Sequence, residues 1–170
     1  MSFSGKPATL YNYEVETIDG EAVKMSAYKG KVLLIVNVAS KCGLTPQYKD
    51  LQAIYNEFKV EGLEVLGFPA NNFMYQEPGS NTKIKAFCTS KFNVTFPMFS
   101  KISVKGKKQH PLYQFLTKKE KNGKFDAPVK WNFQKYLVGR DGQVIDWIAP
   151  GDKVTDKKVR AKIKKALKQS

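Results

Sequence analysis

The sequence has few of the residues that build metal centres or disulfide frameworks. Its 170 residues include two cysteines and one histidine. A structural zinc site uses about four Cys or His ligands, so we predict no metal. Two cysteines are also too few for the disulfide scaffold of a small secreted domain. A cysteine protease would need His110 as its partner, and counting residues leaves that alternative open. We interpret His110, which precedes a proline, as a structural residue at a helix start.

Long apolar segments are missing as well. No run of 18 apolar residues is present, which excludes a typical membrane-spanning helix. The first residues, M-S-F-S-G-K-P-A, lack the apolar core of a signal peptide. The last three, K-Q-S, are not the peroxisomal S-K-L signal. We therefore expect a soluble, cytoplasmic protein.

Acidic residues are scarce relative to basic ones. The chain has 15 Asp and Glu against 29 Lys and Arg, which gives a formal net charge of +14. This excess suits a nucleic acid, an anionic membrane or an acidic partner. Much of it lies in three runs that lack the interleaved aromatic residues of a nucleic-acid site, at 105–108, 118–121 and 157–168. We expect a solvated surface with no specific nucleic-acid partner, and add weak contact with anionic membranes as a hypothesis.

The clearest positive pattern is the stretch 32–45. Seven residues, 32–38, form a β-branched apolar run in which Asn37 is the only polar member, as expected of a buried strand. Cys42 follows, ahead of a helix predicted over 46–60 with Thr45 as its cap and Pro46 at its first position. Sites in open α/β sheets lie at such strand ends, and a helix N-terminus favours a thiolate. We infer that Cys42 is a reactive nucleophile, the alternative being an inert core thiol.

The remaining periodicities predict a single α/β domain over 1–170, with a mixed sheet and helices on both faces. An N-terminal β-hairpin is expected over 13–17 and 21–25, with a type I′ turn at Asp19-Gly20. A strand over 63–68 should run parallel to the central strand. The other expected elements are a helix from 80 or 81 to 92, extended segments at 96–99 and 102–104, a short helix from 110, a Lys-rich loop, strands at 136–138 and 144–148, and a helix over 155–167.

Three segments resemble the motifs of the glutathione peroxidase family. They read N-V-A-S-K-C-G-L-T at 37–45, F-P-A-N-N-F followed by Q-E-P-G-S-N at 68–81, and K-W-N-F at 130–133. Their order and spacing match over nearly the full chain. The resemblance implies a thioredoxin-like fold and reduction of hydroperoxides, with no cofactor. It also implies a catalytic tetrad, which by position becomes Cys42, Asn72, Trp131 and Asn132, with Asn72 standing where the family has glutamine.

The resemblance also bears on how the oxidised thiol is recycled. Cys88 matches the resolving cysteine of members that are reduced by thioredoxin-type proteins rather than by glutathione. Cys42 would form a sulfenic acid, condense with Cys88 to a disulfide and be reduced by an external dithiol. Lys41, Asn71 and Gln76 are possible auxiliary residues, since Asn72 is one methylene shorter than glutamine. Without the motifs, Cys88 reads as a small buried hydrophobe, Trp131 as a core aromatic and Asn132 as a turn residue.

Two further expectations concern assembly and role. The span between Phe115 and Trp131 is short, which by resemblance implies a monomer with an open site. Such a site would accept lipid hydroperoxides as well as hydrogen peroxide. Two other functions remain compatible with the sequence: a peroxide sensor that passes its oxidation to a client protein, and a basic binding protein in which Asn72 marks lost catalysis.

Overall fold

A four-stranded mixed sheet forms the centre of the molecule. The computed structural model describes residues 7–169. Residues 1–6 and 170 lie outside the described range, and with them parts of the two ends on which the targeting expectations rest. The strand order is β4 (Leu63–Pro69), β3 (Val32–Val38), β5 (Lys135–Val138) and β6 (Val144–Ile148). The β3–β4 pair is parallel, as predicted, and the other two pairs are antiparallel.

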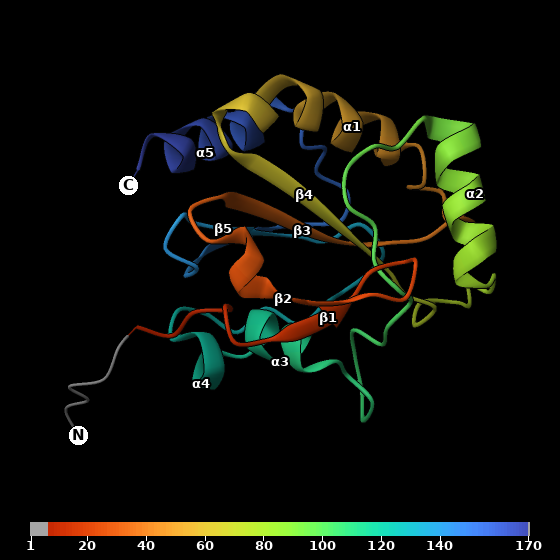
Figure 1. The fold of residues 1–170 in the computed structure, drawn as a ribbon, viewed down its shortest axis with the longest axis horizontal. Helices are drawn as coiled ribbons and strands as arrows, with labels where there is room; N and C mark the ends of the chain where they lie inside the picture. The colour runs from red at the N-terminus through yellow and green to blue at the C-terminus, as the bar shows by residue number, and fades with distance from the viewer. Residues whose placement is uncertain (1–6, 170) are drawn as a thin grey trace.

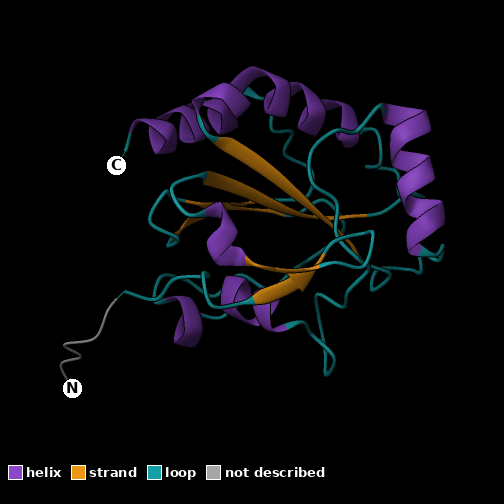
Figure 2. Cartoon of the chain, viewed as in Figure 1, coloured by secondary structure: helices purple, strands orange, loops and turns teal. Residues whose placement is uncertain are grey.

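Helices cover both faces of this sheet, which explains the apolar run of β3. All seven residues of β3 are buried. The even-numbered valines and leucine join one hydrophobic cluster with α1 (Gln47–Phe58) and α5 (Lys157–Lys168). Leu33 and Ile35 join the opposite cluster with α3 (Pro111–Thr117). Figures 1 and 2 show α1 and α5 on one side of the strands and α3 on the other. A strand buried on both faces reads as continuously hydrophobic.

Three short helices and one peripheral helix complete the set. The short ones are η1 (Met25–Tyr28), η2 (Lys59–Glu61) and α4 (Lys119–Asn122), the last within the segment predicted as a Lys-rich loop. The His110 side chain accepts a hydrogen bond from Leu112 N at 3.1 Å, which confirms it as a helix-start residue. The peripheral helix α2 (Asn81–Phe92) starts at Ser80 as predicted and lies at one end of the sheet (Figure 1). None of the helices in residues 7–169 is both long and apolar enough to cross a bilayer.

The N-terminal hairpin is present, but its turn differs from the prediction. Strands β1 (Glu14–Glu16) and β2 (Ala22–Lys24) pair antiparallel. A type I′ turn needs positive φ at both central residues, and at Asp19-Gly20 only Gly20, at +91°, has it. The chain instead closes a three-residue loop, with Gly20 N donating to Thr17 O and Thr17 N donating to Glu21 O. This is the longer hairpin geometry that ends in a left-handed glycine.

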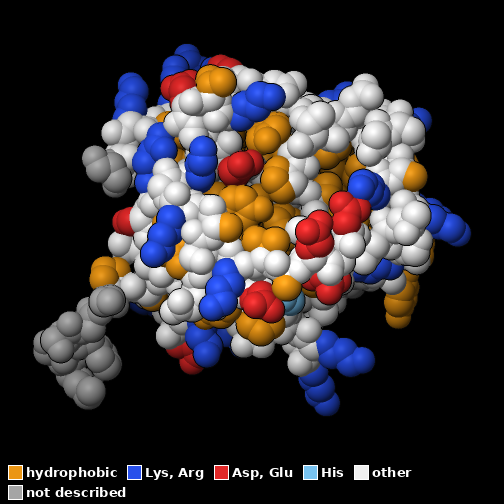
Figure 3. All heavy atoms as spheres, viewed as in Figure 1, with side chains coloured by type: hydrophobic (Ala, Val, Ile, Leu, Met, Phe, Trp, Pro, Cys, Tyr) orange, Lys and Arg blue, Asp and Glu red, His pale blue; other side chains and the backbone are white. Residues whose placement is uncertain are grey.

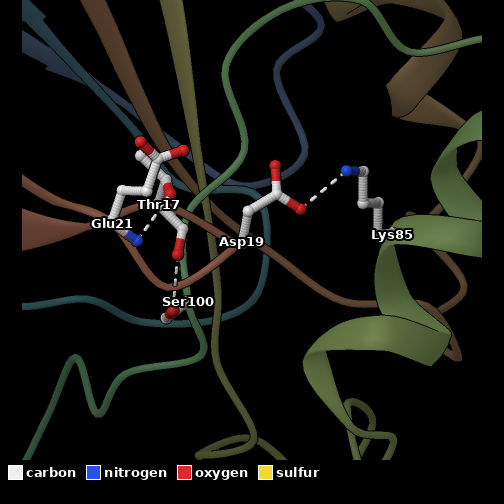
Figure 4. Close-up of polar contacts among 5 residues, drawn as sticks. All are labelled: Thr17, Asp19, Glu21, Lys85 and Ser100. Atoms are coloured by element: carbon white, nitrogen blue, oxygen red, sulfur yellow. Dashed lines mark hydrogen bonds and ion pairs between the residues drawn. The ribbon is translucent and has the colours of Figure 1, made fainter.

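Polar contacts fix this hairpin to the rest of the molecule (Figure 4). Ser100 Oγ donates to Thr17 O at 2.7 Å, and within the hairpin Glu21 N donates to Thr17 Oγ1 at 3.1 Å. On α2, Lys85 Nζ forms an ion pair of 2.6 Å with Asp19 in the hairpin loop. The hairpin therefore connects directly to the helix that carries Cys88.

The extended region expected at 96–104 is less regular than predicted. It forms single bridges, Met98 with Gly67 and Phe99 with Thr17, and Ile102–Val104 belongs to no strand. A Cβ atom at Gly67 would lie 2.5 Å from Met98 Sδ, so a side chain at this position of β4 would force the Met98 side chain to move. The segment thus continues the sheet edge for one bridge and then diverges.

Candidate active site

Cys42 lies in a tight turn between β3 and α1. Its side chain is buried, with 9% exposed. Cys42 N donates to Thr45 Oγ1 at 2.9 Å, and the same hydroxyl donates to Ala39 O at 2.8 Å. Leu44 N donates to Cys42 Sγ at 3.3 Å, so a backbone N–H is directed at the sulfur. An N–H donor of this kind interacts most strongly with a negatively charged sulfur.

Thr45 has a different role from the one predicted. We expected it to cap α1, but Pro46 occupies the cap position and makes no side-chain cap bond. The Thr45 hydroxyl is instead used to close the turn that carries Cys42. The prediction was wrong because the loop turns once more before the helix starts, and this places the threonine inside the turn.

Gln76 and Asn132 lie next to this turn. Lys41 N donates to Gln76 O at 3.0 Å, which ties the residue before the cysteine to the loop after β4. The fully buried Asn132 donates from Nδ2 to Gln76 Oε1 at 2.9 Å. The Gln76 side-chain oxygen accepts this hydrogen bond, so the NH₂ group of the same amide points away from Asn132 and can donate to another group. Hydrogen bonds therefore connect the turn of Cys42, Gln76 and Asn132.

Asn37 positions the segment that contains Trp131. Its Nδ2 donates to Trp131 O at 3.1 Å, and its backbone oxygen accepts from Phe133 N at 2.7 Å. Phe133 is buried and left-handed, with φ of +66°. The Trp131 ring packs on Phe73 with centroids 5.4 Å apart. Sequence reasoning noted Asn37 as the one polar residue of its strand but gave it no role, although that isolated polar position was the available signal.

Asn72 is placed away from these groups. Its side chain is exposed, with Nδ2 donating to Ser103 Oγ at 3.0 Å and Oδ1 accepting from Val104 N at 2.9 Å. The structure thus does not bring Asn72, predicted as a member of the tetrad, into the hydrogen-bonded group of Cys42, Gln76 and Asn132. The physical reason is the path of the chain: Met74 and Tyr75 are both left-handed, so the loop reverses between positions 72 and 76.

The other two auxiliary candidates surround Glu77. Asn71 Oδ1 accepts from Glu77 N at 2.9 Å and so shapes the loop. The Lys41 side chain is exposed and lies near the Glu77 carboxyl. Glu77 is fully buried, and burial raises its pKa while Ser40, Lys101 and Lys41 oppose that rise. Sequence reasoning missed this carboxyl, because only the fold shows that it is enclosed.

Cys88 occupies a contrasting position in the middle of α2. Its side chain is 2% exposed and belongs to the same hydrophobic cluster as Cys42, and both thiols are free. Burial raises the pKa of the Cys88 thiol to about 11; the nearby Tyr48 hydroxyl opposes this shift and the Glu77 charge adds to it. The helix itself is weakly anchored. It buries only Ile84 and Cys88, whereas α1 buries five side chains.

The fold defines the class of protein. A thiol-disulfide interchange protein of the thioredoxin family from Chlorobium tepidum superposes with a TM-score of 0.67 at 17% identity, over 97% of this chain and 99% of that one. That likeness shows the fold alone, and the fold is thioredoxin-like. The crystal structure of Trgpx in its apo form is more similar, with a TM-score of 0.75 and 42% identity over 96% of this chain and 98% of the other.

Sequence comparisons identify the family. Residues 10–117 match the family model described as glutathione peroxidase. A glutathione peroxidase of Lactococcus lactis is 51% identical over 158 residues, covering 93% of this chain and 99% of the relative. The thioredoxin/glutathione peroxidase BtuE of Escherichia coli is 48% identical over 172 aligned residues, covering 90% and 94%. The hydroperoxy fatty acid reductase gpx1 of Synechocystis is 47% identical over 142 residues, covering 81% and 84%. The chain belongs to the glutathione peroxidase family and is a glutathione peroxidase-like peroxidase.

Proposed function

We propose that the protein is a two-cysteine thiol peroxidase in which Cys42 is oxidised, Cys88 resolves the product and a thioredoxin-type protein restores both thiols. The observation that carries this proposal is the setting of Cys42. Leu44 N donates a hydrogen bond to the Cys42 sulfur at 3.3 Å. The turn that carries Cys42 is hydrogen-bonded to Gln76, which is in turn hydrogen-bonded to Asn132. We assign to Gln76 the amide role that the sequence motif suggested for Asn72.

The first step uses neutral donors. The Cys42 thiolate attacks one peroxide oxygen, the O–O bond breaks, and the sulfur becomes a sulfenic acid while the other oxygen leaves as water or an alcohol after taking a proton. The Gln76 amide, the Asn132 amide and the Trp131 indole N–H can stabilise the thiolate and the leaving oxygen. Such donors have no proton equilibrium of their own near neutral pH, so they remain donors throughout the reaction.

The second step requires α2 to change. The Cys88 sulfur displaces hydroxide from the sulfenic acid, an S–S bond forms, and the protons lost and gained yield one water. A disulfide requires Cα atoms within about 7 Å of each other. Cys88 is in the third turn of a regular helix and its thiol is held protonated by burial. Local unwinding would expose the thiol, and a helix that buries two side chains is suited to that opening.

The third step consumes two thiols from outside the chain. A dithiol protein attacks the Cys42–Cys88 disulfide and leaves with its own disulfide, which returns both cysteines to thiols. The name of the Escherichia coli relative, thioredoxin/glutathione peroxidase, supports a thioredoxin-type reductant. The name of the Synechocystis relative supports hydroperoxides of fatty acids as substrates beside hydrogen peroxide.

The test follows peroxide consumption by the wild type, Cys42→Ser and Cys88→Ser, each with thioredoxin and with glutathione. We expect Cys42→Ser to consume no peroxide above the uncatalysed rate. Cys88→Ser should consume about one equivalent and then stop with thioredoxin as the reductant, because its sulfenic acid cannot form the disulfide that thioredoxin attacks.

Mass spectrometry of the oxidised proteins provides the control. The wild type should contain an intramolecular disulfide, and Cys88→Ser should contain one added oxygen. Turnover of Cys88→Ser with thioredoxin at the wild-type rate would rule out the resolving role of Cys88 while leaving the peroxidase assignment of Cys42 intact.

A further inference from the structure

Two apolar side chains, Met74 and Tyr75, project from the loop beside the active site. They are 73% and 80% exposed, among the largest values for big apolar residues in the described chain. Both are left-handed, with φ of +56° and +54°. That backbone conformation is unfavourable for residues other than glycine. The chain therefore holds two large apolar groups in water on strained backbone, which calls for a reason beyond folding.

The residues on both sides hold this tip in place. On one side, the Asn72 side chain is hydrogen-bonded to Ser103 and Val104, and the ring of Phe73 packs against Trp131. On the other side, Gln76 is bonded to Asn132 through its side chain and to Lys41 N through its backbone. Because both ends are fixed, Met74 and Tyr75 cannot fold back onto the core without breaking these contacts. We call these two residues the apolar tip.

Lysines surround the apolar tip. The hydrogen bonds of Asn72 join it to the exposed loop with Lys105, Lys107 and Lys108, which extends from the body at the lower right in Figure 1. Figure 3 shows Lys or Arg side chains standing out along that edge. The Lys105 ammonium lies 5.8 Å from the Phe73 ring centroid. We call the three lysines of this loop the lysine collar.

A groove connects the tip and the collar. Tyr75, Lys101 and Lys108 line the same open hollow of about 1320 Å³, and the described residues around it include no Asp or Glu. The ion pairs found within residues 7–169 use Lys85, Arg160 and Lys162, not the collar. Within residues 7–169, no carboxylate forms an ion pair with Lys105, Lys107 or Lys108.

We propose that the apolar tip and the lysine collar together dock the protein on an anionic lipid bilayer. Tyrosine suits the headgroup level of a membrane, methionine can enter the acyl boundary, and lysines near the surface attract anionic headgroups. A protein partner fits less well, because a stable protein interface buries about 800 Å² on each side and two side chains supply a small part of that.

Docking would orient the active site. Gln76 directly follows the tip, and its backbone holds the turn of Cys42, so a docked molecule would present this turn to the lipid surface. A hydroperoxide on a lipid chain could then reach the thiol without leaving the bilayer. This consequence for catalysis rests on the proposed function, whereas the binding itself does not.

The test is co-sedimentation of the reduced full-length protein with phosphatidylcholine vesicles, with and without phosphatidylglycerol, at low and high salt. Met74→Gly/Tyr75→Gly removes both side chains and also relieves the left-handed strain, so it should fold at least as well as the wild type. We expect it to bind phosphatidylglycerol vesicles about tenfold more weakly. Lys107→Glu/Lys108→Glu should lose at least as much, along with most of the salt dependence.

Matched controls separate a local surface from the overall charge of +14. Lys118→Glu/Lys119→Glu makes the same charge change in another exposed run, and Val60→Ser removes an apolar side chain that is 87% exposed elsewhere. Both should bind within about twofold of the wild type. Equal loss in the two lysine variants, unchanged binding of the tip variant, or no binding by the wild type would overturn the proposal. So would loss of thioredoxin-driven turnover in the tip variant without lipid, since that would indicate a protein docking site.

The assay also keeps the two proposals apart. Vesicle binding is measured on reduced protein with no peroxide present, so it gives the same answer whether or not the peroxidase cycle is correct. Peroxide consumption without vesicles tests the cycle alone.

Discussion

The two cysteines belong to one hydrophobic cluster, yet their surroundings are opposite. Cys42 lies in a turn after a strand and receives a backbone N–H at its sulfur, and the residue before it is hydrogen-bonded to Gln76. Cys88 lies within a helix, and burial raises its pKa to about 11. Burial thus keeps the Cys88 thiol neutral, whereas the Cys42 sulfur has a hydrogen-bond donor beside it.

In the proposed cycle, this difference would let the two thiols act in order. A thiolate is a far better nucleophile than a thiol, so peroxide should oxidise Cys42 first while Cys88 is protected by its helix. In the proposed cycle, Cys88 reacts after α2 opens. The proposed order of the two steps would then follow from the local structure of the two segments, and changes in either segment should alter one step and leave the other.

The largest effect should come from the amide beside Cys42. Replacing Gln76 by alanine removes the amide that we propose as a donor to the reacting atoms, and loss of one such donor typically slows a reaction by about 100-fold. We expect that loss in the rate of Cys42 oxidation, measured by stopped-flow tryptophan fluorescence under single-turnover conditions. Conversion of sulfenic acid to disulfide should change much less.

Asn72→Ala provides the matched control, since it removes an amide from the same loop. Its bonds run to Ser103 and Val104, so oxidation of Cys42 should stay within about threefold of the wild type. A large loss in Asn72→Ala with little change in Gln76→Ala would reverse our assignment and restore the residue predicted from the motif.

A second effect should appear in the pH dependence of stability. The Cys88 thiol has a raised pKa in the folded state, so its contribution is fully present below the unfolded pKa near 9 and is lost as pH rises through about 11. Two pH units correspond to about 2 to 3 kcal/mol. We expect the free energy of unfolding of the reduced wild type to fall by about 2 kcal/mol more than that of Cys88→Ala over this range. Urea unfolding at several pH values measures it.

Taking the difference between the wild type and Cys88→Ala also cancels the effect of other titrating groups on the free energy of unfolding. Burial lowers the pKa of Lys135 to about 8, which acts in the opposite direction because stability then rises with pH. Lys135 is present in both proteins, so its effect cancels in the difference. Parallel pH curves for the two proteins would show that Cys88 is not held as a neutral thiol.

The smallest effect should come from the contact between α2 and the hairpin. Asp19 and Lys85 form an ion pair of 2.6 Å, but both side chains are more than half exposed, so the pair contributes little stability. Lys85→Ala should favour opening of α2 and speed disulfide formation by less than about threefold. Lys83→Ala, an exposed lysine on the same helix, should leave the rate unchanged. A slower rate in Lys85→Ala would mean that the pair assists the step rather than restraining it.

The sequence by itself determined much of this protein. The apolar run 32–38, the spacing of apolar residues in the helices and the turn glycines depend on local physical rules, so β3, α1, α2, α5 and a mixed sheet with helices on both faces followed from them. The thioredoxin-like fold followed from the resemblance of the three motifs to a known family. Cys42 at the strand end and His110 at a helix start were likewise readable, because each depends on its immediate neighbours in the chain.

Only the tertiary structure shows which amide of the loop is hydrogen-bonded to Asn132. The Gln76–Asn132 bond joins residues 56 positions apart, and the Asn37–Trp131 bond joins residues 94 positions apart. A motif places residues 72 and 76 on the same loop but does not say which of them faces the site. That choice depends on the reversal at Met74 and Tyr75, where contacts on both sides of the loop override the ordinary backbone preference of the residues themselves.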